Sequence, residues 1–127
     1  MKLAHVALWT VDLDAAVAFW KSVFGAEVGE PYRSSRRPGF TSRFVHLPKG
    51  GTTIELMTAP WIEAVPDREI AGWDHVAVSV GSEREVDDLA QRCRKIGILS
   101  SEPRWTGDGF YEAVIVTPDG SRVEITS

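Results

Sequence analysis

The chain has 127 residues, which is enough for one compact domain and too few for two independent ones. Its apolar fraction of 43% and charged fraction of 25% are typical of a globular protein with an ordinary hydrophobic core. The net charge of −4 gives no electrostatic support for nucleic-acid binding, and no apolar run approaches the roughly 20 residues that span a bilayer.

The N-terminal stretch M-K-L-A-H-V-A-L-W is short and turns polar too early to predict a signal peptide. A single cysteine excludes an internal disulfide, and Cys93 falls in the apolar stripe of a predicted helix, where we expect it to be buried. A cytoplasmic location, with no membrane or nucleic-acid partner, is therefore the default expectation.

The first half of the chain opens with a predicted strand at 5–10, followed by a helix at 13–24 that ends before Gly25. Either Asp12 or Asp14 can cap the start of this helix. Further strands are expected at 27–32, 41–47 and 52–57, the last two as a hairpin around P-K-G-G.

A basic cluster interrupts this half in a segment rich in serine, proline and glycine. Arg33, Arg36 and Arg37 lie there close together. We interpret the segment as a solvated loop, with an anion-contacting loop as the alternative.

The second half repeats the first after a junction near 59–72. Its strand at 75–80 reads H-V-A-V-S-V, where residues 5–10 read H-V-A-L-W-T. A helix follows at 83–96 before Gly97, with capping-box spacing at its start. The remaining strands are expected at 99–104, 111–117 and 121–126, the last two as a hairpin around P-D-G.

Two offsets support the duplication. His75 follows His5 by 70 residues, and Glu124 in V-E-I follows Glu55 in I-E-L by 69. Each repeat, about 1–60 and 71–127, is therefore predicted to be a β-α-β-β-β unit. The fold class is α+β, with the paired units forming a curved mixed sheet around a cavity.

Because side chains alternate along a strand, these four side chains are all expected on the face of a sheet that points away from the helix. Each histidine or glutamate alternates with aliphatic residues that must pack under a helix, so the polar side chains project from the opposite face. We therefore predict one divalent metal site with four protein ligands: His5, Glu55, His75 and Glu124. Mixed nitrogen and oxygen ligands suit Zn, Ni, Co, Mn or Fe(II).

With these residues in view, the sequence resembles the vicinal-oxygen-chelate superfamily, and within it the glyoxalase I family. The similar segments are H-V-A-L-W-T-V-D-L-D-A-A-V-A-F-W at the start, G-W-D-H-V-A-V-S-V at 72–80 and P-D-G-S-R-V-E-I near the end. The resemblance implies a metal-dependent lyase or isomerase that acts on an α-oxo or α-hydroxycarbonyl compound, such as a hemithioacetal, through an enediolate. It also implies that Glu124 is the catalytic base, with Glu55 assisting on the opposite face.

Two departures from the glyoxalase I pattern favour a substrate other than glutathione. Trp9 stands where that family often has an arginine, and M-T-A-P at 57–60 replaces a frequent asparagine. Trp9 shares the face of His5 and is predicted to line the substrate pocket. The other predicted pocket residues are Met57, Ser79, Asp108 and Tyr111.

The same resemblance implies a homodimer with a small-molecule substrate. The alternatives are an extradiol-type Fe(II) dioxygenase and a metal-free binding protein similar to the bleomycin-sequestering members of the superfamily. The dioxygenase requires three open metal positions, of which Glu55 would fill one. The metal-free proteins have lost the ligand set that this chain retains.

Overall fold

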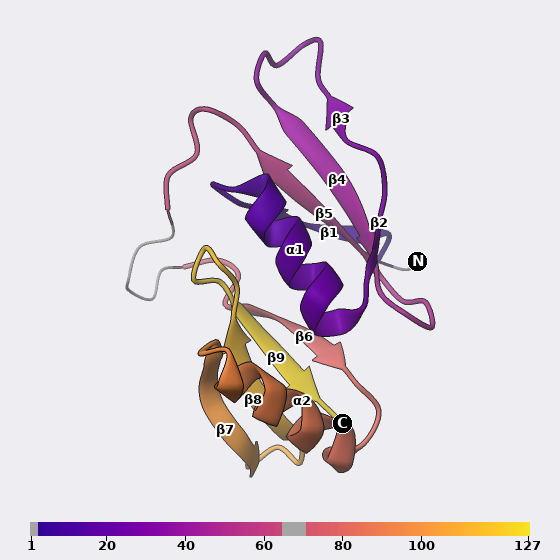
Figure 1. The fold of residues 1–127 in the computed structure, drawn as a ribbon, viewed down its shortest axis with the longest axis vertical. Helices are drawn as coiled ribbons and strands as arrows, with labels where there is room; N and C mark the ends of the chain where they lie inside the picture. The colour runs from indigo at the N-terminus through magenta and orange to yellow at the C-terminus, as the bar shows by residue number, and fades with distance from the viewer. Residues whose placement is uncertain (1–2, 65–70) are drawn as a thin grey trace. The chain divides into compact units, whose positions relative to one another are not determined.

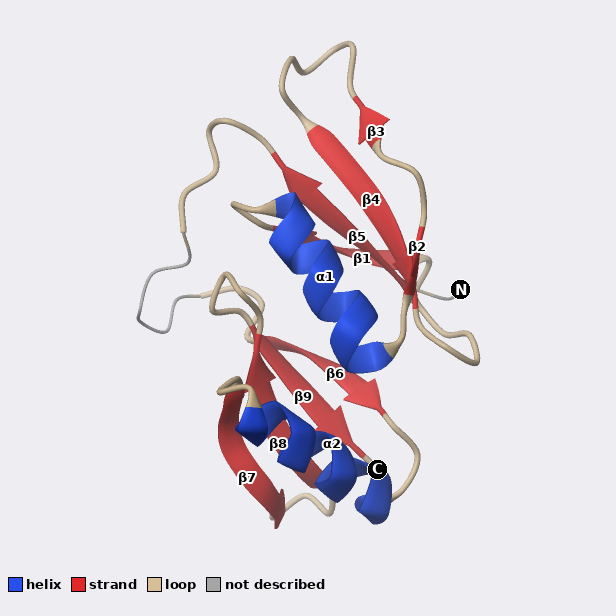
Figure 2. Ribbon diagram, in the orientation of Figure 1, coloured by secondary structure: helices blue, strands red, loops and turns tan. Residues whose placement is uncertain are grey.

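The structure, a computed structural model, describes residues 3–64 and 71–127. The chain divides into two compact units, residues 1–64 and 65–127, and each contains one helix and one sheet (Figures 1 and 2). The predicted junction at 59–72 lies partly outside the described residues. No helix in the part of the chain that is described is long and apolar enough to cross a membrane.

The first unit is built from five short strands and one helix. They are β1 (His5–Trp9), α1 (Leu13–Phe24), β2 (Glu27–Val28), β3 (Tyr32–Arg33), β4 (Thr41–His46) and β5 (Thr53–Thr58). The sheet order is β1-β5-β4-β2, and β3 also pairs with β4. Strands β1 and β5 are parallel, and the other pairs are antiparallel.

The expected single strand at 27–32 is wrong, because the chain forms β2 and β3 instead. Val28 lies opposite Val45 and Tyr32 lies opposite Ser42. The segment from 28 to 32 therefore contains one residue more than the segment of β4 that it faces. The extra residue falls in the segment G-E-P at 29–31, where proline has no N–H to donate to a ladder.

The second unit has the β-α-β-β-β order that the repeat predicts. Its elements are β6 (His75–Ser79), α2 (Glu83–Lys95), β7 (Leu99–Trp105), β8 (Tyr111–Val116) and β9 (Arg122–Thr126). The sheet order is β6-β9-β8-β7, with β6 and β9 parallel and the remaining pairs antiparallel. The first and last strands of each unit are therefore parallel neighbours.

Side-chain caps fix where both helices begin. The Asp12 carboxylate accepts a hydrogen bond from the Ala15 N–H at 2.9 Å, so Asp12 rather than Asp14 caps α1. In α2, the Ser82 hydroxyl accepts from the Glu85 N–H at 3.3 Å and donates to the Glu85 carboxylate at 2.9 Å. These bonds satisfy N–H groups that the first turn of a helix leaves unpaired.

Each helix covers the aliphatic face of its own sheet. Helix α1 contacts β4 and β5, and helix α2 contacts β7, β8 and β9. Cys93 lies within the second core with 1% of its surface exposed, which confirms the expected burial, and burial raises its pKa. The largest buried side chains are Trp20, Val45, Ile54 and Leu56 in the first unit and Val86, Ile115, Val123 and Ile125 in the second.

We predict that Asp12→Ala lowers the free energy of unfolding by about 1 kcal/mol, because it leaves the Ala15 N–H without its cap. Urea unfolding followed by circular dichroism measures the change. Asp14→Ala is the matched control, because Asp14 lies in the first turn of the same helix and its side chain is not the cap. Equal destabilisation by the two substitutions would contradict the capping role.

Candidate functional site

The same strand register brings one histidine and one glutamate together in each unit. Ala7 on β1 lies opposite Glu55 on β5, and Ala77 on β6 lies opposite Glu124 on β9. Each alanine comes two residues after the histidine of its own strand. The histidine and the glutamate are therefore diagonal neighbours on one face of the sheet, a distance that long side chains can bridge.

The two pairs have similar geometry. His5 Nε2 lies 3.8 Å from Glu55 Oε2, and His75 Nε2 lies 3.4 Å from Glu124 Oε2. The carboxylates are the more enclosed partners, since the Glu55 and Glu124 side chains are 18% and 17% exposed. Within each unit the structure thus places the predicted ligands side by side, on the face that the helix leaves open.

Each pair offers one imidazole nitrogen and one carboxylate, a donor set that fits a divalent transition-metal ion. Among the residues that the structure describes, no group of three or more His, Cys, Asp or Glu side chains is arranged to hold a metal ion. A unit alone supplies two ligands, and the four-ligand site stays a prediction.

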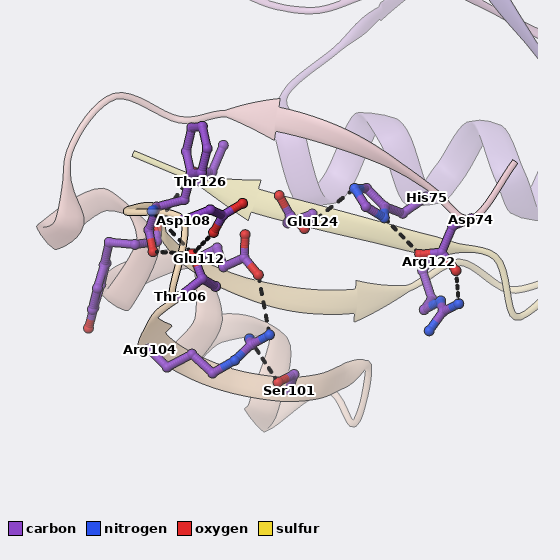
Figure 3. A network of polar contacts seen from close by, with 12 residues as sticks. Asp74, His75, Ser101, Arg104, Thr106, Asp108, Glu112, Arg122, Glu124 and Thr126 are labelled. Atoms are coloured by element: carbon purple, nitrogen blue, oxygen red, sulfur yellow. Dashed lines mark hydrogen bonds and ion pairs between the residues drawn. The ribbon is translucent and has the colours of Figure 1, made fainter.

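In the second unit, Asp74 holds the ring of His75 in a fixed orientation (Figure 3). Asp74 Oδ2 lies 2.8 Å from His75 Nδ1, and Arg122 forms an ion pair with the other Asp74 oxygen. The hydrogen bond to His75 lowers the pKa of Asp74, and the charge of Arg122 lowers it further. A proton on Nδ1, donated to Asp74, would leave the lone pair on Nε2, the ring nitrogen that lies 3.4 Å from Glu124.

Glu112, which the sequence analysis did not select, lies beside Glu124 (Figure 3). Val114 on β8 is opposite Glu124, so Glu112 is its diagonal neighbour, and it is only 7% exposed. Arg104 Nη2 lies 3.2 Å from Glu112 Oε1. Burial raises the pKa of Glu112, and its hydrogen bond with Glu124 and the repulsion between the two carboxylates raise it further. The sequence signal that could have identified Glu112 is its carboxyl group, the one charged side chain in the strand Y-E-A-V-I-V.

The first unit surrounds its histidine differently. Ala4 precedes His5 at the position where Asp74 precedes His75, so His5 has no carboxylate from the neighbouring residue. Instead, the ring of Phe44 on β4 meets the His5 ring edge to face, with centroids 5.7 Å apart. The two pairs therefore share a register but differ in polarity.

Three of the predicted pocket residues lie on the same faces as the ligands. Trp9 on β1 is opposite Met57 on β5 and shares the face of His5, and 38% of its surface is exposed. Ser79 alternates with the buried Val78 and lies on the exposed face of His75. Their contact with a substrate stays a prediction.

Asp108 and Tyr111 lie in or beside the loop between β7 and β8. The Thr106 hydroxyl donates to Asp108, and the charge of Asp108 contributes to the raised pKa of Glu112. The Tyr111 hydroxyl donates to Asp87 of helix α2 at 2.8 Å, an interaction that raises the pKa of Tyr111. This bond directs Tyr111 to the helix side of the sheet and does not support its predicted place in the pocket.

The fold agrees with a comparison of the sequence with known families. The model of the Glyoxalase/Bleomycin resistance protein/Dioxygenase superfamily matches residues 2–125, and the chain belongs to this superfamily. Its members commonly bind a divalent metal ion.

Three relatives illustrate the range of the family. The mitochondrial methylmalonyl-CoA epimerase of Bos taurus is 37% identical over 81% of this chain, which spans 59% of the length of that enzyme. A glyoxalase/bleomycin resistance protein/dioxygenase domain from Frankia sp. has a TM-score of 0.85 at 20% identity, covering 99% of this chain and 96% of that one. The trypanothione-dependent glyoxalase I of Leishmania major has a TM-score of 0.78 at 22% identity, covering 100% of this chain and 86% of that one.

The structural similarities establish the fold alone, because both sequence identities are below 25%. The substrate and the individual reaction do not follow from these similarities.

We predict that Glu112 makes the metal-free protein less stable as the pH rises. Its folded pKa lies above the ordinary value of 4.5, so between the two values the folded state binds more protons than the unfolded state does. The free energy of unfolding therefore falls through this window. Glu112→Gln keeps the shape and a hydrogen-bond donor but does not titrate, and the fall should become shallower. Urea unfolding of both proteins at several pH values from 4 upward measures it, and identical slopes would contradict the assignment.

Proposed function

We propose that this protein is a metal-dependent enzyme that moves a proton at a carbon next to a carbonyl group. The observation that carries the proposal is the His75–Glu124 pair, which is supported from one side by Asp74 and from the other by Glu112. A histidine with a fixed ring orientation and an enclosed carboxylate beside it are the parts that a metal ligand and a general base require.

The proposed ligands are the two His–Glu pairs, one from each unit, which together make the four-ligand set that the sequence predicts. His5 and His75 would bind through Nε2, the atom that faces the neighbouring carboxylate in both units. A bound divalent ion would polarise the substrate carbonyl and make the adjacent C–H group more acidic.

Glu124 is the proposed base. Its carboxylate is largely enclosed and lies beside Glu112, whose pKa is raised by burial and by its hydrogen bond with Glu124. In an epimerisation, Glu124 would take the proton from one face of the carbon and Glu55 would deliver a proton to the opposite face; in an isomerisation, Glu124 would return the proton to the neighbouring carbon. Glu55 is thus proposed to assist on the opposite face of the substrate.

The proposed substrates are acyl thioesters or hemithioacetals with an acidic C–H group. The relative with 37% identity is named methylmalonyl-CoA epimerase, which makes a thioester of this class the first compound to test. The hemithioacetal of methylglyoxal and glutathione is the second, although Trp9 in place of the frequent arginine argues against glutathione. A homodimer and a cytoplasmic location stay predictions.

Proton transfer is tested by incubating the metal-loaded protein with each compound in D₂O and measuring deuterium at the reacting carbon by mass spectrometry. We expect wild type to incorporate deuterium and Glu124→Gln to be slower by about 10²–10⁴-fold, because the base is removed. Glu30→Gln, an exposed glutamate outside the site, is the control and should match wild type. Unchanged exchange in Glu124→Gln would show that another group is the base.

No exchange with either compound, under any metal loading, would overturn the proposed reaction. Ferrous iron together with oxygen consumption would instead favour the dioxygenase alternative. A protein that binds no metal at all would favour a binding protein of the same fold.

We predict that Asp74→Ala weakens metal binding by about 10–100-fold, because His75 loses the carboxylate that orients its ring. Competition with a coloured chelator measures the affinity, and elemental analysis gives the stoichiometry. Asp88→Ala is the control, since Asp88 is an exposed aspartate that pairs with Arg84 on the surface of α2. A four-ligand site requires one ion for each chain; two ions would mean that each His–Glu pair binds metal separately.

A further inference from the structure

Arg37 in the first unit lies among three aromatic rings. Its guanidinium carbon is 5.9 Å from the centroid of Trp9, 5.1 Å from that of Phe40 and 5.1 Å from that of Trp61. The rings of Trp9 and Phe40 also meet edge to face at 5.9 Å. Three segments that are separate in the sequence thus converge on one cation.

Two hydrogen bonds and one close contact hold the loop that carries Arg37. The Ser34 hydroxyl accepts from the Arg37 N–H at 3.0 Å, and the Arg37 carbonyl accepts from the Phe40 N–H at 3.0 Å. Gly39, at φ +87°, packs against Pro60 so closely that a Cβ would come within 2.7 Å of the ring. This contact brings the loop against the segment that contains Trp61, while Arg36 and Arg37 stay exposed to solvent, as the sequence predicts.

The charge of Arg37 is not neutralised by any carboxylate in the described ranges 3–64 and 71–127. Other arginines of the chain do form such ion pairs, namely Arg84, Arg94, Arg104 and Arg122. Aromatic rings contact the flat faces of a guanidinium, whereas its N–H groups donate in the plane and match the two oxygens of a carboxylate or phosphate. Arg37 is therefore a cation in a fixed position with donors available to an anion.

Trp9 connects this cation with the His5–Glu55 pair. It lies two residues beyond Ala7, which is opposite Glu55, so it is about 7 Å further along the same face. The next residues across the sheet at this level are Met57 and then Ser42. Ser42 Oγ is buried and has no hydrogen-bond partner among the residues described. Beyond the His5–Glu55 pair, this face of the sheet therefore carries the apolar side chains of Trp9 and Met57 and, next to them, the hydroxyl group of Ser42.

We propose that Arg37 is a specificity-determining residue that binds an anionic group of the substrate, a carboxylate or a phosphate, at the end that lies away from the metal ligands. Trp9 and Met57 would contact the part of the substrate between the reacting carbonyl and this anion. The inference rests on the proposed function for its link to catalysis, but the anion site itself can be measured without turnover.

The five tryptophans of the chain provide the measurement, through the indole N–H signals in two-dimensional NMR spectra. Inorganic phosphate and sodium propionate are titrated separately into the full-length protein, against sodium chloride at equal ionic strength. We expect saturable shifts of Trp9 and Trp61, with Trp20 unmoved because it is 1% exposed in the core. Saturation by phosphate alone identifies a phosphate site, and saturation by propionate identifies a carboxylate site.

Arg37→Gln should weaken the bound anion by about tenfold or more, since a charge-assisted hydrogen bond is lost. Arg36→Gln removes the same charge from the adjacent position and should bind within about twofold of wild type. Arg37→Lys, which keeps the charge without the planar fork, should bind several-fold more weakly than wild type and provides a second test if Arg37→Gln is unstable. Once a substrate is known, Arg37→Gln should raise its KM by a similar factor and leave kcat nearly unchanged.

Equal effects of Arg36→Gln and Arg37→Gln would overturn the proposal, because they would reflect net charge alone. The absence of saturable shifts at Trp9 and Trp61, or unaltered binding in both Arg37 variants, would overturn it as well. Anion binding without any deuterium exchange would leave this site intact and refute only the proposed reaction.

Discussion

The parallel pairing of the first and last strands is the constraint on which the site in each unit depends. A shift of one residue between β1 and β5, or between β6 and β9, would turn either the histidine or the glutamate toward the helix. The register is held by the aliphatic side chains on the opposite face, of which Ile54, Leu56, Val123 and Ile125 are nearly inaccessible to solvent. The hydrophobic core therefore determines where the polar groups meet.

The His–Glu pairs of the two units share a register but have different neighbouring side chains. Asp74 and Glu112 in the second unit correspond to Ala4 and Ser42 in the first, so the His75–Glu124 pair has two acidic neighbours that the His5–Glu55 pair lacks. Ionisable groups with shifted pKa values gather at sites of proton transfer, and Asp74 and Glu112 both have shifted pKa values, which favours the second unit for that step. The first unit, with Phe44, Trp9 and Arg37 on or beside its open face, has the chemistry of a binding surface instead.

Much of this arrangement could be read from the sequence, because repeats and strand alternation are local signals. The offset between the two halves and the phase of His5 and Glu55 within their strands predicted that each histidine lies beside a glutamate, and the capping residues predicted both helix starts. Asp74 was missed because neighbouring residues in an extended strand usually point to opposite faces, so nothing in the sequence indicates that it reaches back to the His75 ring. Glu112 was missed because its proximity to Glu124 depends on the pairing of β8 with β9. The break between β2 and β3 was missed because the extra residue becomes evident only when both strands are aligned with β4.

The contact between Trp9 and Arg37 changes the functional interpretation of Trp9. From the sequence, an aromatic ring in place of an arginine indicates a more apolar pocket. In the structure, the same ring lies against the guanidinium of Arg37, which comes from a loop almost thirty residues later in the chain. A cation held against an aromatic face loses some of its hydration, and its remaining donors then gain more from an anion. Position 9 can therefore belong to a cationic pocket without being cationic itself, and an apolar side chain there is compatible with a charged substrate.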